Sequence, residues 1–438
     1  MNNKPKLSKH FESREPSPIR MAQIAFNKRK DSTIAINTAI GNVSLPMHPA
    51  MISRMNDLQN KNSPFSQGVV KYSSTVGLQE TNDAFLNIIQ SSGFQTNNLY
   101  SQITNGGSQA MELIILGLCG EAGTSNKPLL MIDAAYTNYK SMAERLGRSI
   151  YSSSRHLDNN GKFLKPDINE IKEIIKKNKP SAMIIIPYDN PTGAFYDHET
   201  IKTYAKLCVE NNMWIVSDEA YRELHYTDDD VASVWGLTEK EVPGITNRRI
   251  SIETASKVWN ACGLRIGALV TDNKEFHEKC VAENTADLCS NVIGQYIFGA
   301  LARESHEKLN EWYNKQRNYY SKIMAQISSE LKKQIPKIIV SNPDASIYSV
   351  IDVRNIAKPN FNALDFVMFC AKNGKVSIDG KDYTLLVAPM CGFYSVENNE
   401  INPGKTQMRI AYIETPENLE LVPKLFKELF IEYESLRE

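Results

Sequence analysis

The sequence predicts an α/β protein: a large domain with a mainly parallel mixed sheet between helices, and a smaller α+β domain. Two patterns support this fold class. In the middle of the chain, short apolar runs rich in β-branched residues alternate with amphipathic stretches of helical period. After about residue 306, one long helical stretch is followed by mixed strands and helices. The chain has 438 residues, 42% of them hydrophobic, which is enough for two domain cores.

Five apolar runs predict strands that are buried on both faces, because they are too short for helices and hydrophobic throughout. They span 129–133, 182–187, 214–218, 250–254 and 267–271. Amphipathic stretches such as 167–179 and 197–212 lie between the first four runs and predict the crossover helices of a parallel sheet. The last two runs are joined by too few residues for such a helix, so we expect them to pair antiparallel.

Residues 306–334 predict one long helix, which ends before Pro336. The later runs predict strands at 337–340, 346–353, 385–390 and 407–413, and a helix near 363–374. This mixture is typical of an α+β domain. We therefore divide the chain into an N-terminal arm (1–35), a large domain (66–305) and a small domain (36–65 and 306–438), with the long helix as the connection.

Composition narrows the class of ligand. The formal net charge is +0 at pH 7, so no global charge favours nucleic acid or an anionic membrane surface. No apolar run approaches the about 20 residues of a membrane-spanning helix, and the N-terminus lacks the apolar core of a signal peptide. The seven cysteines form no CxxC pair and the histidines no HExxH spacing, which favours a cytoplasmic protein without a metal site. We expect a small-molecule ligand.

Polar clusters follow three of the predicted strands, at the edge of a parallel sheet where ligands bind. The segment "IIIPYDNPTG" carries Asn190, "WIVSDEAY" carries Asp218 and Tyr221, and "ISIETASK" carries Thr254, Ser256 and Lys257. In "TNGGSQAMELIILGL", a helix begins at Gly106, Gly107 and Ser108, where free backbone N–H groups attract an anion. Together these clusters predict a phosphate cradle beside an acid and a lysine.

Two cations, Lys257 and Arg265, lie in the apolar stretch "ISIETASKVWNACGLRIGALV" (250–270). Because lysine and arginine usually stay in water, this stretch predicts a negative or electrophilic partner. With "DNPTG", "SDEAY", "TASKVWNACGLRIG" and a late arginine in "QMRIA", in this order, the chain resembles the class I/II aminotransferases of fold type I, the aspartate aminotransferase family. The resemblance extends from about residue 36 to 415. It implies pyridoxal 5′-phosphate as the cofactor.

The resemblance implies a role for each residue near the reacting part of the cofactor. Lys257 would form the Schiff base, and burial near other cations would keep its amine unprotonated. Asp218 would pair with the protonated pyridine nitrogen and keep the ring an electron sink. Tyr221 and Asn190 would donate hydrogen bonds to the phenolic oxygen. Lys257, Asp218 and Tyr221 are thus the expected catalytic residues.

The remaining cofactor contacts concern the ring face and the phosphate. Tyr136 would stack on the ring, although Ala134 stands where the family usually has proline. The phosphate would be held by Arg265, the hydroxyls of Thr254 and Ser256, and the N–H groups of Gly107 and Ser108. A guanidinium suits this ligand because it makes two fixed hydrogen bonds to a phosphate. Thr254 departs from the usual serine or glycine of the family, but it keeps a hydroxyl.

Substrate recognition rests on fewer residues. Arg409 in "QMRIA" would bind the α-carboxylate of an amino acid, with Gly41 of "TAIGN" and Asn190 beside it. Tyr72 in "KYSSTVG" resembles the tyrosine that reaches the cofactor phosphate of the neighbouring subunit, which implies a homodimer with shared active sites. No second arginine can be assigned to a dicarboxylate substrate, so the side-chain preference stays open.

The function implied by the resemblance is amino-group transfer between an amino acid and a 2-oxo acid, with ping-pong kinetics because two half-reactions share one site. A carbon–sulfur β-lyase would use the same Lys257, Asp218 and Tyr221. An acyl-CoA-dependent synthase usually has histidine where Tyr136 stands. A non-catalytic sensor of the cofactor would need a DNA-binding domain, and we expect the about 35 residues before "INTAIGN" to be too few for one.

Overall fold

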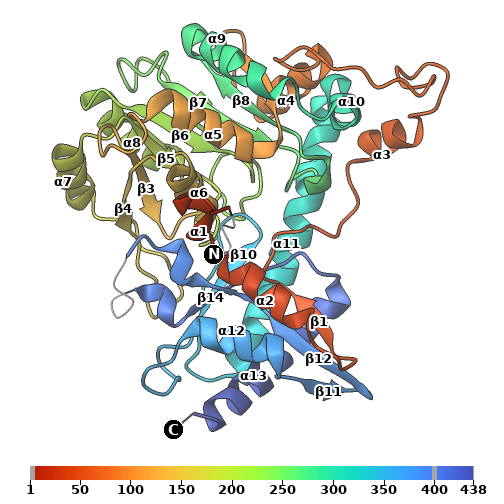
Figure 1. Ribbon diagram of the computed structural model, residues 1–438, viewed down its shortest axis with the longest axis vertical. Helices are drawn as coiled ribbons and strands as arrows, with labels where there is room; N and C mark the ends of the chain where they lie inside the picture. Colours follow the sequence, from red (N-terminus) through yellow and green to blue (C-terminus); the bar gives the residue numbers. More distant parts are fainter. Residues whose placement is uncertain (1–4, 397–401, 438) are drawn as a thin grey trace.

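The computed structural model describes residues 5–396 and 402–437, and it has the predicted α/β architecture (Figure 1). Its largest sheet has seven strands in the order β2-β8-β7-β6-β5-β3-β4. Their bounds are β2 Tyr100–Thr104, β3 Leu129–Asp133, β4 Ile150–Ser154, β5 Ala182–Ile185, β6 Trp214–Asp218, β7 Arg249–Thr254 and β8 Gly267–Thr271. Strands β3 to β7 are parallel to one another, whereas β8 is antiparallel to β7 and β2. The predicted fold class is confirmed.

Five strands of this sheet are the five apolar runs, and the antiparallel pairing expected for the last two is confirmed in β7 and β8. Sequence analysis missed β2 and β4. Strand β4 is a partly exposed edge strand with the sequence IYSSS, so it lacks an apolar run. Strand β2 buries polar side chains, among them Gln102 and Thr104. The connection from β6 to β7 holds a short 3-10 helix, Val234–Gly236, in place of the α-helix that the alternation predicts.

Helices cover both faces of this sheet (Figure 1). Helices α5, α6 and α9 pack on one face, and α4, α7 and α8 on the other. Their bounds are α4 Gln79–Ser91, α5 Gly106–Leu118, α6 Thr137–Arg145, α7 Ile168–Asn178, α8 His198–Glu210 and α9 Lys274–Glu283. In β3, the side chains of Leu129 and Met131 belong to the core beneath α5, α6 and α9. Those of Leu130 and Ile132 belong to the core beneath α4, α7 and α8. Each strand therefore supplies two cores, as its pleat requires.

Two smaller sheets form the second part of the molecule, with strand orders β13-β14-β10-β9 and β1-β12-β11. Their bounds are β1 Ile34–Asn37, β9 Ile339–Val340, β10 Tyr348–Asp352, β11 Val376–Ile378, β12 Lys381–Leu386, β13 Ala388–Pro389 and β14 Gln407–Ala411. The predicted long helix is confirmed as α11 (His306–Gln334), which runs from the large sheet into this part (Figure 1). Helices α12 (Ala363–Lys372) and α13 (Pro416–Ser435) complete it.

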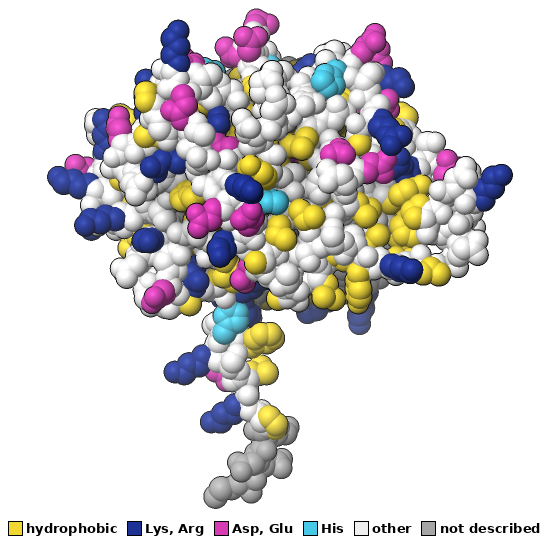
Figure 2. Space-filling view, turned by 90° about the horizontal axis from the view of Figure 1, so that it is seen from above, with side chains coloured by type: hydrophobic (Ala, Val, Ile, Leu, Met, Phe, Trp, Pro, Cys, Tyr) yellow, Lys and Arg dark blue, Asp and Glu magenta, His cyan; other side chains and the backbone are white. Residues whose placement is uncertain are grey.

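The N-terminal segment contacts both parts. Helix α2 (Pro18–Phe26) packs against α12, and β1 pairs with β12, whereas α3 (Pro49–Asn56) packs against α10 (Val292–Gly299) beside the large sheet. A short helix, α1 (Lys9–Glu12), precedes them. In Figure 2 the described residues around α1 project from the body, and Leu7 and Phe11 are exposed. The division into an arm and two domains stays a prediction.

The surface in Figure 2 carries positive and negative side chains that are interspersed, without a large patch of one sign on this face. Within residues 5–396 and 402–437, no helix is both long and apolar enough to span a membrane. In the same part of the chain, no three His, Cys, Asp or Glu side chains gather in a group that could hold a metal ion.

Candidate active site

A cavity of about 770 Å³ lies at the carboxyl ends of β5, β6 and β7, between the large sheet and the smaller part of the molecule. Twelve residues that the sequence singled out line it: Gly41, Gly107, Ser108, Tyr136, Asn190, Asp218, Tyr221, Thr254, Ser256, Lys257, Arg265 and Arg409. They come from seven separate segments of the chain. The fold therefore brings them into one place, which the sequence could only infer from a resemblance.

Tyr72 does not line this cavity. Its side chain is 79% exposed in the long connection between α3 and α4, and two apolar neighbours on that connection, Val69 and Val70, are also exposed. Within one chain, Tyr72 thus makes no contribution to the cavity. Its predicted role in a partner's site stays a prediction.

Asp218 ends β6 and presents its carboxyl to the cavity. One carboxyl oxygen, Oδ1, accepts a hydrogen bond from the Ala220 backbone N–H at 3.0 Å, and the other accepts one from the Tyr139 hydroxyl. Burial raises the pKa of Asp218 to about 6, and these two hydrogen bonds act against that rise. Tyr139 was not predicted from the sequence. It lies in the first turn of α6, directly after the N-cap residue Tyr136, and the two ring centres are 5.4 Å apart.

Lys257 follows β7 and donates a hydrogen bond from Nζ to the Gly41 carbonyl oxygen. A Cβ atom on Gly41 would lie 2.9 Å from Lys257 Nζ and 2.6 Å from the hydroxyl oxygen of Tyr348. Such distances leave no room for a side chain at residue 41. Glycine is therefore required here by the close approach of the amine and the Tyr348 hydroxyl.

Arg265 and the start of α5 form a cradle that suits an anion. Gly106 has φ +71°, and a Cβ atom there would lie 2.6 Å from Arg265 Nη2, so only glycine lets the guanidinium reach this helix terminus. Arg265 Nη1 donates to the Cys262 carbonyl oxygen at 3.1 Å. The Thr254 and Ser256 hydroxyls lie 2.8 Å apart at the end of β7 and face the same cavity. Backbone N–H groups of the first turn of α5 add to this positive end.

Arg409 lies on β14 and is only 4% exposed. Its Nη1 donates to Asn190 Oδ1 at 2.8 Å, and its Nη2 donates to the Ala39 carbonyl oxygen at 2.6 Å. The guanidinium carbon stands 4.3 Å from the ring centre of Tyr348, and Nε is buried without a hydrogen-bond partner. The side chain is thus held in place by neutral groups. Its positive charge is left for a ligand.

Lys257 and Arg265 resemble Arg409 in having no charged partner. Within the described part of the chain, none of these three side chains forms an ion pair with a carboxylate. Arg409 is buried and needs a counter-charge, whereas Arg265 is exposed to the open cavity. The two guanidinium groups suit a ligand with two separate negative groups, or two ligands with one negative group each.

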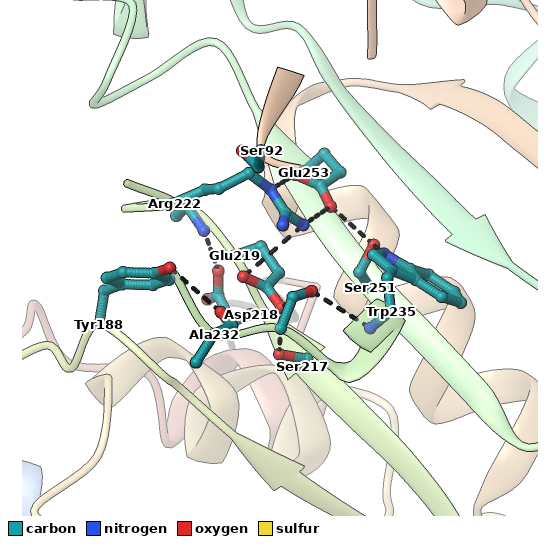
Figure 3. A network of polar contacts seen from close by, with 12 residues as sticks. Ser92, Tyr188, Ser217, Asp218, Glu219, Arg222, Ala232, Trp235, Ser251 and Glu253 are labelled. Atoms are coloured by element: carbon teal, nitrogen blue, oxygen red, sulfur yellow. Dashed lines mark hydrogen bonds and ion pairs between the residues drawn. The ribbon is translucent and has the colours of Figure 1, made fainter. Parts of the chain in front are cut away.

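Buried ion pairs do occur close behind the cavity (Figure 3). Arg222 Nη2 lies 2.6 Å from Glu253 Oε1 and 3.6 Å from Glu219 Oε2, and all three side chains are almost fully buried. Ser217 and Ser233 donate hydrogen bonds to Glu219 at 2.8 Å. Because Glu219 follows Asp218 and Glu253 precedes Thr254 in sequence, this network fixes the backbone that carries two cavity residues.

A second buried ion pair holds the loops after β3 and β5 together. Arg155 Nη2 lies 2.8 Å from Asp189 Oδ2 and 2.7 Å from the Ala134 carbonyl oxygen. Asp189 also accepts the Thr192 N–H and hydroxyl, which shapes the "DNPTG" turn. The peptide bond before Ala134 is cis. These contacts position Tyr136 and Asn190, which follow these two strands.

The residues present fit an aromatic cofactor that carries a phosphate. The lack of a side chain at Gly106 lets the Arg265 guanidinium lie against the start of α5, and Arg265 has no carboxylate partner in the described chain. Asp218 offers a carboxyl at the bottom of the cavity, and the Tyr136 ring lines its wall. Tyr136 keeps its proton, because burial raises its pKa to about 12. Lys257 supplies an amine beside these groups.

Several solved structures that share this fold are named as aminotransferases. An aspartate aminotransferase of Thermus thermophilus matches with a TM-score of 0.78 at 18% identity, covering 97% of this chain and 100% of that one. Bna3p, a putative kynurenine aminotransferase of Saccharomyces cerevisiae, matches with a TM-score of 0.78 at 19% identity, covering 98% and 99%. At these identities the likeness defines the fold, which is that of the aspartate aminotransferases.

The sequence comparison defines the family. The family model described as aminotransferase class I and II matches residues 33–383, so the chain belongs to that family, as the motifs predicted. An aspartate aminotransferase of Pyrococcus horikoshii is 32% identical over 194 residues, 42% of this chain and 44% of that protein. A probable aspartate/prephenate aminotransferase of Aquifex aeolicus is 28% identical over 211 residues, 48% and 52%. The chain thus spans about half the length of these curated relatives. Arg409 lies outside the matched residues.

Proposed function

We propose that this protein transfers amino groups between an amino acid and a 2-oxo acid, with pyridoxal 5′-phosphate as cofactor. The observation that carries the proposal is one cavity that unites a lysine amine, a protonatable carboxyl and two arginines without internal counter-charges. When bound, the cofactor supplies an electron sink for the negative charge that develops at the substrate Cα. The names of the relatives support this class of reaction.

The cofactor would be held by residues of the large sheet. Arg265, Thr254 and Ser256, with the N–H groups of Gly107 and Ser108, would bind the phosphate. Asp218 would hold the pyridine nitrogen proton, since an ionised carboxylate is favoured once a cation lies beside it. Tyr136 would cover the ring face. Tyr221 and Asn190 would donate hydrogen bonds to the phenolic oxygen.

The substrate would be held from the smaller part of the molecule. Arg409 would bind the α-carboxylate with its planar fork, and the Gly41 backbone would lie beside that carboxylate. Lys257 would move the proton between the substrate Cα and the cofactor C4′, acting as base and then as acid. Because the two half-reactions would take place in turn in this one site, we propose a ping-pong cycle.

A labelling experiment tests this proposal. The purified protein is incubated with pyridoxal phosphate, reduced with borohydride and digested, and the labelled peptide is identified by mass spectrometry. We expect the label on Lys257 alone and none on a Lys257→Ala variant. Label on another lysine would contradict the assignment of the site.

A panel of amino acids then separates the possible reactions. The absorbance of the bound cofactor should convert on adding an amino acid and recover on adding a 2-oxo acid. Release of pyruvate and ammonia without an oxo-acid acceptor would indicate β-elimination instead. Binding of the cofactor without turnover of any amino acid would indicate a sensor.

We also propose a cytoplasmic homodimer in which each site borrows Tyr72 from the partner. The exposed position of Tyr72, away from the cavity of its own chain, supports this arrangement. A Lys257→Ala chain is mixed with a Tyr72→Ala chain and allowed to exchange. Each mixed dimer then has one site with every native group, so random 1:1 pairing should restore about a quarter of all sites. Activity equal to the sum of the separate variants, despite exchange, would exclude sharing through Tyr72.

A further inference from the structure

Tyr348 is a cavity residue that no sequence motif includes. It lies on β10, is 1% exposed, and reaches the cavity from the side opposite to the large sheet. Strand β10 pairs with β14 so that Val350 stands opposite Arg409. Tyr348 is two residues from Val350 and points to the same face, which places its ring diagonally beside Arg409. The register of this strand pair therefore explains why the guanidinium stands 4.3 Å from the ring centre.

The hydroxyl of Tyr348 contacts two of the residues that we assign to the reaction. Its oxygen lies 2.7 Å from the Tyr221 hydroxyl oxygen. It also lies against Gly41, where a Cβ atom would come within 2.6 Å of the Tyr348 hydroxyl and 2.9 Å of Lys257 Nζ. Tyr348 thus stands among Arg409, Tyr221 and Lys257, in contact with the first two and beside the third.

The direction of the hydrogen bond between the two tyrosines follows from the proposed function. A phenol has one proton to donate. If Tyr221 donates that proton to the phenolic oxygen of the cofactor, its own oxygen must accept from Tyr348. The other donor to Tyr221, Asn190 Nδ2, is 3.4 Å away and therefore weaker. Tyr348 is then the main donor to Tyr221.

We propose that Tyr348 is a positioning residue for amino-group transfer: its hydroxyl donates to Tyr221, which strengthens the hydrogen bond that Tyr221 donates to the cofactor, while its ring supports the guanidinium of Arg409. This inference rests on the proposed function. A donor that itself accepts a hydrogen bond is polarised and becomes a stronger donor. The charged or titratable side chains that face Tyr348 are Tyr136, Tyr221, Lys257, Tyr320 and Arg409.

The hydroxyl and the ring can be tested separately. Tyr348→Phe removes only the hydroxyl, so the hydrogen bond to the phenolic oxygen weakens and the negative oxygen is less stabilised. The pH midpoint at which the absorbance of the lysine-bound cofactor changes should rise by up to about one unit, the size that one hydrogen bond allows. The KM for amino acids should change little, because the ring remains beside Arg409. Tyr348→Leu should raise both the midpoint and KM.

A matched control variant distinguishes the proposed positioning role of Tyr348 from the general effect of removing a buried hydroxyl group. Tyr412 directly follows β14 and is fully buried, and its hydroxyl lies 2.7 Å from that of Ser349 on β10, outside the cavity. Tyr412→Phe should therefore lower thermal stability to a similar degree without moving the absorbance midpoint.

A double variant tests the route through Tyr221. In a Tyr221→Phe background the hydrogen bond to the cofactor is absent, so Tyr348→Phe should produce no further shift of the midpoint. An unchanged midpoint in the single Tyr348→Phe variant, or the same shift in both backgrounds, would overturn the proposal. A wild-type protein that shows no lysine-bound cofactor would instead refute the proposed function, and the inference with it.

Discussion

Arg222 and Arg265 are two guanidinium groups near the ends of β6 and β7, yet their charges are balanced in different ways. Arg222 is 2% exposed and faces two carboxylates of its own chain, Glu253 at 2.6 Å and Glu219 at 3.6 Å (Figure 3). Arg265 opens into the cavity, and within the described residues it forms no ion pair.

The difference distinguishes an arginine that stabilises the fold from an arginine that is available to a ligand. Burying a cation is costly unless an anion lies beside it, and the chain supplies that anion for Arg222. Arg265 is exposed at the open cavity, where water or an anionic ligand balances its charge. A buried cation without an internal partner is a stronger indication of a ligand, and Arg409 is such a cation on the other wall of the cavity.

The largest effect on stability is expected for Arg222, whose charge is balanced by carboxylates of its own chain. Arg222→Met leaves two buried carboxylates without a cation and should reduce the free energy of unfolding by about 3–5 kcal/mol. Urea unfolding of the cofactor-free protein measures this. The matched Arg265→Met variant should change the same free energy by less than about 1 kcal/mol. Equal losses in the two variants would remove the distinction between them.

The second prediction concerns the other cavity arginine. Arg409→Ala should cost about 2–5 kcal/mol of interaction with the amino-acid substrate, because the carboxylate loses a buried, charged partner. Steady-state kinetics would show this as a fall in kcat/KM, while the absorbance of the bound cofactor should stay as in wild type. Unchanged kinetics would place the carboxylate elsewhere in the cavity.

A somewhat smaller loss of binding free energy is expected when Arg265 of the proposed phosphate cradle is replaced. Arg265→Met should weaken cofactor binding by about 2–4 kcal/mol, since in our proposal the hydroxyls of Thr254 and Ser256 and the helix terminus would still hold the phosphate. Equilibrium titration with pyridoxal phosphate measures the change. Retention of the wild-type affinity would show that the cradle binds no phosphate through this arginine.

The fourth prediction uses the pKa of Asp218, which burial raises from 3.8 to about 6 in the cofactor-free protein. The folded state then holds this proton more tightly than the unfolded state. The associated stability is fully present below about pH 4 and is lost as the pH rises through about 6, by up to about 3 kcal/mol. Asp218→Asn should abolish that loss, so urea unfolding at pH 4 and pH 7 should differ less than in wild type. Parallel pH profiles would contradict the raised pKa.

Most strands of the large sheet were predictable, because strands buried on both faces leave short, continuously apolar runs in the sequence. Strand β4 was not, since it lies at an edge and exposes part of IYSSS to water. Strand β2 was not either, because its polar side chains are buried by pairing with β8 and by later segments of the chain. Edge position and long-range pairing are properties of the assembled sheet, which local periodicity does not record.

The residues of the candidate site also fall into those that the sequence predicted and those that it did not. Lys257, Asp218 and Arg265 lie in motifs of fixed spacing, and the resemblance to a known family rests on those spacings. Tyr139 and Tyr348 belong to no motif. Their hydroxyls reach Asp218 and Tyr221 only because α6 and β10 fold against the end of the large sheet.

Hydrophobic period and short motifs are local properties of the chain, so they were enough to predict the fold class, the family and the twelve cavity residues that lie in motifs. Only the tertiary structure decided which charges are balanced inside the protein. Arg222 has glutamates at positions 219 and 223 beside it in the sequence, whereas Arg265 stands among Cys, Gly and Leu, but neither pattern fixes which carboxylate pairs with the guanidinium. Their difference depends on whether a carboxylate from another strand lies within reach, as Glu253 of β7 does for Arg222. That distance is set when the strands pair.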